Sequence, residues 1–222
     1  MDTITTLLST ISGWVWGPVM LALLLGTGIY LTLGLRGIPQ RKLFYGFSML
    51  FAGRRQTSQP GDITPFQALA TALSATVGTG NIAGVATAIH LGGPGAVFWM
   101  WVTALVGMAT KYGEAVLAVK YRETNAEGAY VGGPMYYIRN GLGTNWKWLA
   151  FAFALFATIA AFGIGNTVQS NSVSQVFDET LSIPRWLTGL VMAAGVFAVI
   201  IGGVQRLASV TDKLVPVMAI IY

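Results

Sequence analysis

The sequence contains no cysteine, only one histidine and few charged residues. Of its 222 residues, 9% are charged and 54% are hydrophobic, whereas a soluble domain carries about 25% charged residues. The absence of cysteine excludes disulfides, thiol catalysis and thiolate metal sites, and a single histidine, His90, excludes a histidine-rich metal site. The net charge of +5 does not indicate nucleic-acid binding, because the basic residues lie in short segments between apolar runs. This composition is that of a membrane protein.

Long apolar runs divide the chain into membrane crossings. Four stretches contain no acidic or basic residue: 3–35, 63–110, 148–177 and 186–205. A helix needs about 20 apolar residues to cross the hydrocarbon core, so the second stretch is long enough for two crossings, with a turn at Gly92-Gly93-Pro94-Gly95. A further apolar run begins at Leu214 and continues to Tyr222. We therefore expect five crossings and part of a sixth, in the N-terminal half of a longer protein.

The expected organisation has three parts. Residues 1–35 form an N-terminal transmembrane helix, residues 36–62 form a basic loop, and residues 63–222 contain the remaining spans. The expected crossings are 14–35, 65–91, 95–118, 148–172, 186–204 and 208–222. The segment 124–146 is polar and rich in glycine and tyrosine, and we expect it at the cytoplasmic interface.

The basic residues are distributed unequally between the two sides of the membrane. Eleven of the 13 lie in the connections after the first, third and fifth expected crossings, which are all on one side. By the positive-inside rule, this side is cytoplasmic and the N-terminus is outside. The expected location is the cell (inner) membrane.

The expected span 65–91 has an unusual midpoint, Val77-Gly78-Thr79-Gly80-Asn81. A glycine inside a helix costs about 1 kcal/mol relative to alanine, and backbone groups freed by a break are costly in lipid. We therefore predict a functional interruption. Carbonyls from Ser74 to Val77, at the negative end of the first half-helix, would hold a cation. Amides from Gly78 to Asn81, at the positive end of the second, would hold a carboxylate.

The glycines of this midpoint also resemble two patterns with a different meaning. Small residues at close spacing are typical of a helix-packing surface, and this alternative stays open. A dinucleotide-binding motif is excluded, because the spacing differs and no strand precedes the glycines. Asn81 either caps the second half-helix or offers its side-chain oxygen to a cation.

The expected span 148–172 supplies a second polar set. Asn166 and Gln169 lie three residues apart, so they share a helix face. At membrane depth such side chains make interhelical hydrogen bonds or bind a ligand, and the sequence favours neither.

Few titratable groups lie near the predicted break. His90 is about nine residues beyond Asn81, near the outer interface, where it serves as a hydrogen-bonded interface residue or a proton relay. Lys111 and Glu114 lie three apart and are expected to pair as a structural or inner-gate contact. Because the broken segment has no acidic residue, sodium is favoured over a proton as the cation.

Four stretches resemble a known family. The run Gly-Gly-Pro-Gly-Ala-Val-Phe-Trp-Met-Trp-Val-Thr-Ala-Leu-Val-Gly, at 92–107, resembles the signature of the sodium:alanine symporters, the alanine or glycine:cation symporter family. Further similarities lie at 78–86, at 132–138, and at 163–166 with 169–172. The resemblance runs from about residue 14 to the end.

This family belongs to the amino acid–polyamine–organocation superfamily. The resemblance implies an all-α membrane protein with the leucine-transporter-type inverted-repeat fold, here an extra N-terminal helix plus a nearly complete first five-helix repeat. It also implies symport of alanine or glycine with sodium by alternating access. The implied substrate ligands are Gly78, Thr79, Gly80, Asn81, Asn166 and Gln169. The implied sodium ligands, mostly backbone carbonyls, are Ser74, Thr76, Val77 and Asn81.

Several alternative functions stay open at this point. A proton-coupled amino acid carrier would share the fold but not the cation. A channel would use the broken helix to line a pore, and a non-transporting membrane fragment would only pack or assemble. A membrane-embedded enzyme is not indicated, because the sequence shows no histidine–carboxylate cluster or nucleophile–base pair.

Overall fold

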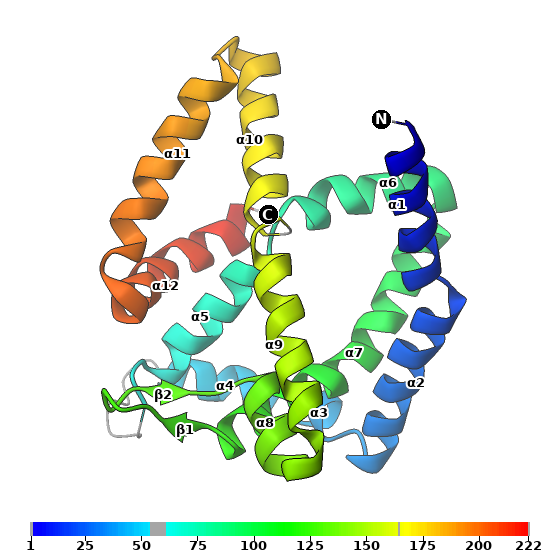
Figure 1. The fold of residues 1–222 in the computed structure, drawn as a ribbon, viewed down its shortest axis with the longest axis vertical. Coiled ribbons are helices and arrows are strands. Elements are labelled where there is room, and N and C mark those ends of the chain that lie inside the picture. The colour runs from blue at the N-terminus through cyan, green and yellow to red at the C-terminus, as the bar shows by residue number, and fades with distance from the viewer. Residues whose placement is uncertain (1, 54–60, 164, 222) are drawn as a thin grey trace.

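The computed structural model of the chain describes residues 2–53, 61–163 and 165–221. In this part of the chain, three helical stretches are long and apolar enough to cross a membrane: Thr3–Gly34, Gly95–Lys120 and Thr144–Leu181. Two bent helix pairs are also long and apolar enough when each pair is taken as one span: Pro65–Thr76 with Gly80–Gly92, and Arg185–Ile200 with Gly203–Ile221. The chain is therefore a multi-pass, all-α membrane protein (Figure 1).

The first apolar stretch consists of two helices, α1 (Asp2–Val15) and α2 (Pro18–Gly34). Pro18 occupies the first position of α2, where its missing N–H is not needed. Helix α2 lies beside α7 (Gly95–Lys120) (Figure 1). Their close approach depends on Gly28, which is buried: an added Cβ would lie 2.5 Å from Val106 Cγ1 and 3.1 Å from the Val106 carbonyl oxygen.

Replacing Gly28 by alanine should destabilise the protein by about 1–3 kcal/mol, because the added methyl group overpacks this contact. Gly26 is the matched control, since an added Cβ there meets nothing within 4 Å. Thermal unfolding of both variants in the same detergent measures the difference. A gain in stability for Gly28→Ala equal to that of Gly26→Ala would contradict the proposed close contact.

The segment 36–62, expected as a basic loop, begins with two helices. A turn with positive φ at Arg36 (51°) and Gly37 (63°) leads into α3 (Ile38–Arg41), and α4 (Leu43–Gly53) follows. The Gln40 side-chain amide donates to the Leu105 carbonyl in α7 at 2.7 Å, which ties α3 to the membrane-spanning core. Residues 54–60 of the expected loop lie outside the described residues.

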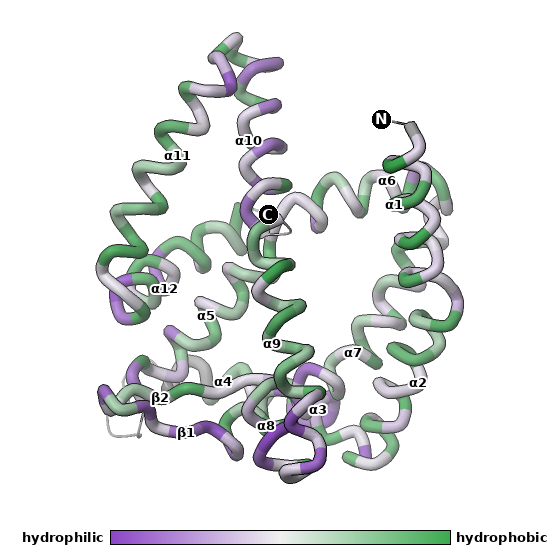
Figure 2. Tube along the Cα trace, in the orientation of Figure 1, coloured by the Kyte–Doolittle hydropathy of each residue, from purple (hydrophilic) through white to green (hydrophobic). Residues whose placement is uncertain are grey.

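A small polar module follows α7. Strands β1 (Glu123–Thr124) and β2 (Tyr130–Val131) pair antiparallel, and α8 (Pro134–Leu142) and a 3₁₀ turn, η2 (Thr144–Trp146), complete it. Hydrophilic residues gather here (Figure 2). Glu123 accepts hydrogen bonds from Asn140 (2.8 Å) and Arg139 (2.6 Å), which lower the pKa of its carboxyl group. The polarity fits the expected interfacial position of 124–146.

The remaining elements build the region around the predicted break. They are α5 (Pro65–Thr76), the π-helical η1 (Gly80–Gly84), α6 (Val85–Gly92), α9 (Lys147–Ala161), α10 (Asn166–Leu181), α11 (Arg185–Ile200) and α12 (Gly203–Ile221). Helices α9 and α10 follow each other through the centre of the molecule, and α12 packs along α5 (Figure 1).

The last two helices differ from the sequence expectation. The basic segment between the expected crossings 186–204 and 208–222 is not a connection: α11 ends at Ile200, α12 begins at Gly203, and the two are bent by 118°. The turn is short because Gly203 adopts a positive φ of 67°. Arg206 therefore lies within a helix, the same one that carries Asp212 and Lys213.

Candidate functional site

The break in the second expected crossing begins at the end of α5. Helix α5 starts with a capping box formed by Thr64 and Gln67 and ends at Thr76. Val77 still donates its N–H to the Leu73 carbonyl (2.8 Å), but its ψ of 119° turns the chain out of the helix. The axis bends by 58° between α5 and the following η1–α6 segment. This bend coincides with the segment for which the sequence predicts an interruption.

The interruption frees backbone groups on both sides. The last carbonyls of a helix have no partner within it. The Leu73 carbonyl accepts the Val77 N–H, so the carbonyls that follow it, from Ser74 to Thr76, are the ones that the end of α5 leaves without a helical partner. On the other side, the Asn81 N–H donates to the Gly78 carbonyl at 3.0 Å, and the chain continues as a π-helix from Gly80. A single-turn π-helix inside an α-helical segment is frequent at functional sites.

Gln169 lies directly against the break. From α10 its side-chain oxygen accepts the Thr79 N–H at 3.1 Å. A Cβ added to Gly78 would lie 2.4 Å from Gln169 Nε2, so any larger residue would displace the end of the Gln169 side chain from its present position. A side-chain amide thus occupies the position where an anionic group would meet the start of the second half-helix.

Asn166 does not share this contact. It is the first residue of α10, and its side-chain oxygen accepts the N–H of Thr167 at 2.8 Å. The structure therefore places Gln169 against Gly78 and Thr79, but Asn166 at the start of its own helix. The i, i+3 spacing of Asn166 and Gln169 predicts that both lie on one helix, as they do in α10. The sequence did not predict that this helix begins at Asn166.

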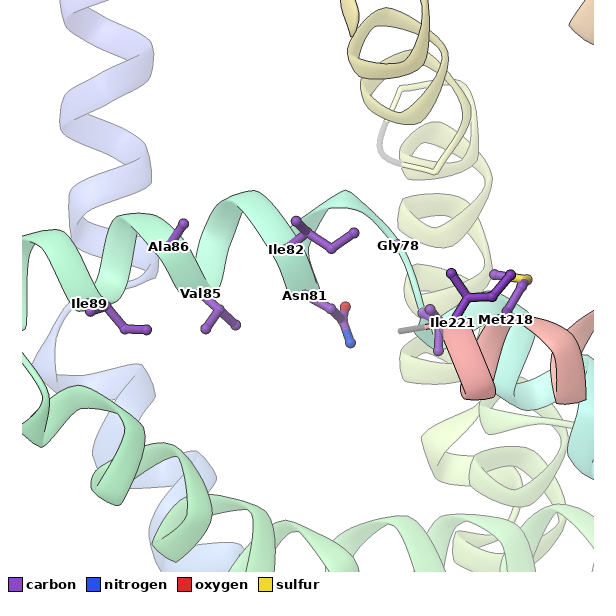
Figure 3. A pocket seen from close by; sticks show the side chains of 9 residues that line it. Gly78, Asn81, Ile82, Val85, Ala86, Ile89, Met218 and Ile221 are labelled. Atoms are coloured by element: carbon purple, nitrogen blue, oxygen red, sulfur yellow. The ribbon is translucent and has the colours of Figure 1, made fainter.

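A groove of about 710 Å³ opens beside the break. It is lined mainly by apolar side chains, and the lining residues include Val77, Gly78, Asn81, Val85, Ile89 and Met218. Figure 3 shows the side chains of Asn81, Val85 and Ile89 pointing to the same side of η1 and α6. An apolar groove with a few polar groups is the usual form of a small-molecule site.

The predicted cation ligands fall into two places. Ser74 lines a second, smaller pocket of about 60 Å³ with Val215 and Met218 of α12, whereas Asn81 lines the larger groove. Val77 lines both. The hydroxyl groups of Ser74 and Thr76 donate back to the carbonyls of Thr71 and Ala72, both at 2.8 Å. These hydroxyl oxygens keep lone pairs that can accept, and Thr76 is exposed.

The titratable residues considered in the sequence analysis, His90, Lys111 and Glu114, do not line this groove. His90 is exposed in the last turn of α6. Lys111 and Glu114 form the predicted ion pair, with 2.9 Å between Lys111 Nζ and Glu114 Oε2. The pair is exposed, and such pairs contribute about 0–1 kcal/mol.

The sequence interpretation missed Asp212. Its carboxylate accepts from Gln67 Nε2 at 3.2 Å, so an acidic side chain lies against the first turn of the broken helix. The residue was overlooked because Arg206 and Lys213, on either side of it, were counted among the basic residues of a connection. Gln67 and Thr71, polar and four residues apart on an otherwise apolar segment, were the available signal that a polar partner faces α5.

A helical chain with several apolar spans, one of them interrupted beside a groove, has the architecture of a membrane transport protein. The chain belongs to the sodium:alanine symporter family, whose family model matches residues 1–222. The family resemblance seen in the sequence is thereby confirmed.

Three relatives illustrate the similarity. The sodium/alanine symporter AgcS of Methanococcus maripaludis is 52% identical over 219 residues, which cover 98% of this chain and 48% of AgcS. The uncharacterized transporter YaaJ of Escherichia coli K12 is 41% identical, with 96% of this chain and 44% of YaaJ covered. The amino-acid carrier protein AlsT of Bacillus subtilis is 36% identical, with 98% and 45% covered. The chain spans about half the length of these curated relatives.

Proposed function

We propose that the protein carrying this chain is a secondary symporter that moves alanine or glycine together with sodium by alternating access. The observation that carries the proposal is the contact of Gln169 with Gly78 and Thr79 at the break. It supports a site where the start of the second half-helix meets a carboxylate. The name of AgcS, a sodium/alanine symporter, supports the choice of substrate and cation.

In this proposal the substrate and the cation bind at opposite sides of the same break. The substrate carboxylate takes the amides from Gly78 to Asn81, and at Thr79 and Asn81 it replaces their present acceptors, the Gln169 side-chain oxygen and the Gly78 carbonyl. Gln169 donates to it through Nε2, and Asn166 contributes from the start of α10. Sodium takes carbonyl oxygens at Ser74, Thr76 and Val77, with Asn81 supplying its side-chain oxygen. The opposite charges of sodium and carboxylate stabilise each other across a short distance in a medium of low dielectric, which couples their binding.

The groove limits the size and polarity of the substrate side chain. Apart from Asn81, its lining side chains are apolar, among them Val85, Ile89 and Met218, and they offer no hydrogen bond to a polar side chain. The methyl side chain of alanine and the hydrogen of glycine can contact these apolar residues without burying a polar group that has no hydrogen-bond partner. This supports a small neutral amino acid over a charged one.

The proposal extends to the fold and the orientation. We assign α1 and α2 to an extra N-terminal segment and the elements from α5 to α12 to the first repeat of a leucine-transporter-type fold. The N-terminus would lie outside the cell membrane. The module of β1, β2 and α8 and the α11–α12 turn would face the cytoplasm.

Counterflow of labelled alanine in proteoliposomes containing the full-length protein tests the function. We expect saturable exchange that falls to background when potassium replaces sodium. Exchange at an unchanged rate without sodium would overturn the cation assignment. If a pH gradient then drove uptake, the proton-coupled alternative would replace it, whereas flux that does not saturate would indicate a channel.

A further inference from the structure

Helices α5 and α12 are joined by a polar seam that the proposed transport site does not use. We define this seam as the paired residues Gln67 with Asp212 and Thr71 with Thr211. The Gln67 amide donates to Asp212 Oδ2 at 3.2 Å, and the two threonine hydroxyl oxygens lie 3.1 Å apart. Two successive turns of α5 are thus tied to two adjacent residues of α12.

Gln67 connects this seam to the start of α5. Its side-chain oxygen accepts the Thr64 N–H at 3.1 Å, and its own N–H donates to the Thr64 hydroxyl at 3.2 Å. The carbonyl of Gln67 accepts from Thr71 at 2.8 Å. The oxygen of the Gln67 side-chain amide is therefore bound to the helix cap and its nitrogen to Asp212. A displacement of Asp212 is thus transmitted to the start of α5.

The seam lies where the described residues are packed most closely. Of the five buried apolar residues in this part of the chain, three lie on these two helices: Ala70, Ala208 and Val215. Alanine side chains let the helix backbones approach closely. Thr211 is buried as well, at 7% exposure. The direction of α5 is therefore set by α12.

Asp212 brings a charge into this contact. Its Oδ1 is buried and has no hydrogen-bond partner among the described residues. Helices α4 and α5 carry no charged side chain, and the only one on α11, Arg185, pairs with Asp178 at 2.8 Å. Arg206 and Lys213 of α12 are exposed. The carboxylate is stabilised mainly by Gln67 and by the positive end of α5.

We propose that Asp212 is a positioning residue for the cation end of α5. Through Gln67 it holds the half-helix on α12, which directs the carbonyls near Ser74 and Val77. These carbonyls lie about 15 Å from Gln67, so a tilt of about 4° there moves them by about 1 Å. The inference rests on the proposed sodium site, and Val215 and Met218, on the same helix α12, line the pocket beside it.

The test is the sodium dependence of alanine uptake by the full-length protein in proteoliposomes. Asp212→Ala should raise the sodium concentration for half-maximal uptake about tenfold, because it removes a hydrogen bond to a charged group. The maximal rate should stay within about twofold, since the substrate contacts are unchanged. Asp212→Asn should restore sodium affinity to within about threefold, because its amide oxygen still accepts from Gln67.

Two further variants make the result specific. Glu179→Ala removes a similar bond, from Gln175 Nε2 at 2.8 Å, at an exposed position of α10, and should leave the sodium dependence unchanged. Gln67→Ala should be at least as impaired as Asp212→Ala, because it also removes the hydrogen bond to the Thr64 N–H. The double variant should be no worse than Gln67→Ala, because both single variants remove the bond between the two side chains. If Asp212→Ala does not give a monodisperse protein, Gln67→Ala tests the loss of the same bond together with that of the helix cap.

Three outcomes would overturn the inference. An unchanged sodium affinity in Asp212→Ala and Gln67→Ala would show that the bond positions nothing. An Asp212→Asn variant as impaired as Asp212→Ala would show that the charge itself is required. Alanine uptake by the wild-type protein that does not depend on sodium would instead refute the proposed function. This measurement needs no variant, so the two failures can be distinguished.

Discussion

Alanine uptake should fall by about 100-fold or more when Gly78 is replaced by alanine. The new Cβ would lie 2.4 Å from Gln169 Nε2 and 3.2 Å from its Cδ, so the amide would have to leave the break. The Thr79 N–H would then lose its acceptor, and the substrate carboxylate would meet a methyl group at the point of closest approach. In enzyme active sites a misplacement of about 1 Å costs up to about 100-fold, and we expect a loss of the same order at this site. Initial rates of labelled alanine uptake measure the loss.

The control for this prediction is Gly84→Ala. Gly84 ends the same π-helical turn, and an added Cβ there meets nothing within 4 Å. Both variants add one methyl group to the same segment, but only at Gly78 does the added group meet the Gln169 side chain. Transport by Gly84→Ala at the wild-type rate would tie the loss to the contact with Gln169. Equal losses in both variants would instead mean that the break only needs flexible glycines.

The location of the break could be predicted from the sequence, and its neighbours only in part. Gly78 and Gly80, in the middle of an apolar run, disfavour a continuous helix. This effect depends only on residues close together in the sequence, so the sequence alone predicts it. The partner of the break is not local: Gln169 is 90 residues away from Thr79. Its polarity made it a candidate, but nothing in the pattern distinguished it from Asn166, whose side chain binds the start of its own helix.

Asp212 illustrates a different limit. A rule that assigns charges to connections works when each helix crosses the membrane straight, and here α11 and α12 meet at 118° after a turn of two residues. The positive φ of Gly203 makes this turn possible. A glycine in the sequence does not by itself predict such a turn, because the chain has 28 glycines. A buried charge on α12 becomes apparent only when its packing against α5 is known.

Gln169→Glu should abolish alanine uptake more completely than Gln169→Leu. The glutamate keeps the shape of the side chain, and its carboxylate accepts the Thr79 N–H more strongly than an amide does. It would therefore occupy the start of the second half-helix with a negative charge and repel the substrate carboxylate. Like charges placed together cost several kcal/mol, so we expect the alanine concentration for half-maximal uptake to rise by more than about 100-fold. Gln169→Leu removes the polar contact without adding charge, and we expect a rise of about tenfold.

The order of these two variants separates two functions of the break. If Gly78 and Thr79 only pack against α10, the isosteric glutamate disturbs the structure less than leucine does, because its oxygen still accepts the Thr79 N–H. If the break holds a carboxylate, the glutamate is the worse substitution. Asn171→Asp, an exposed change of the same charge two residues along α10, should transport normally and so exclude a general effect of charge on this helix. Leucine worse than glutamate would mean that the anion site lies elsewhere.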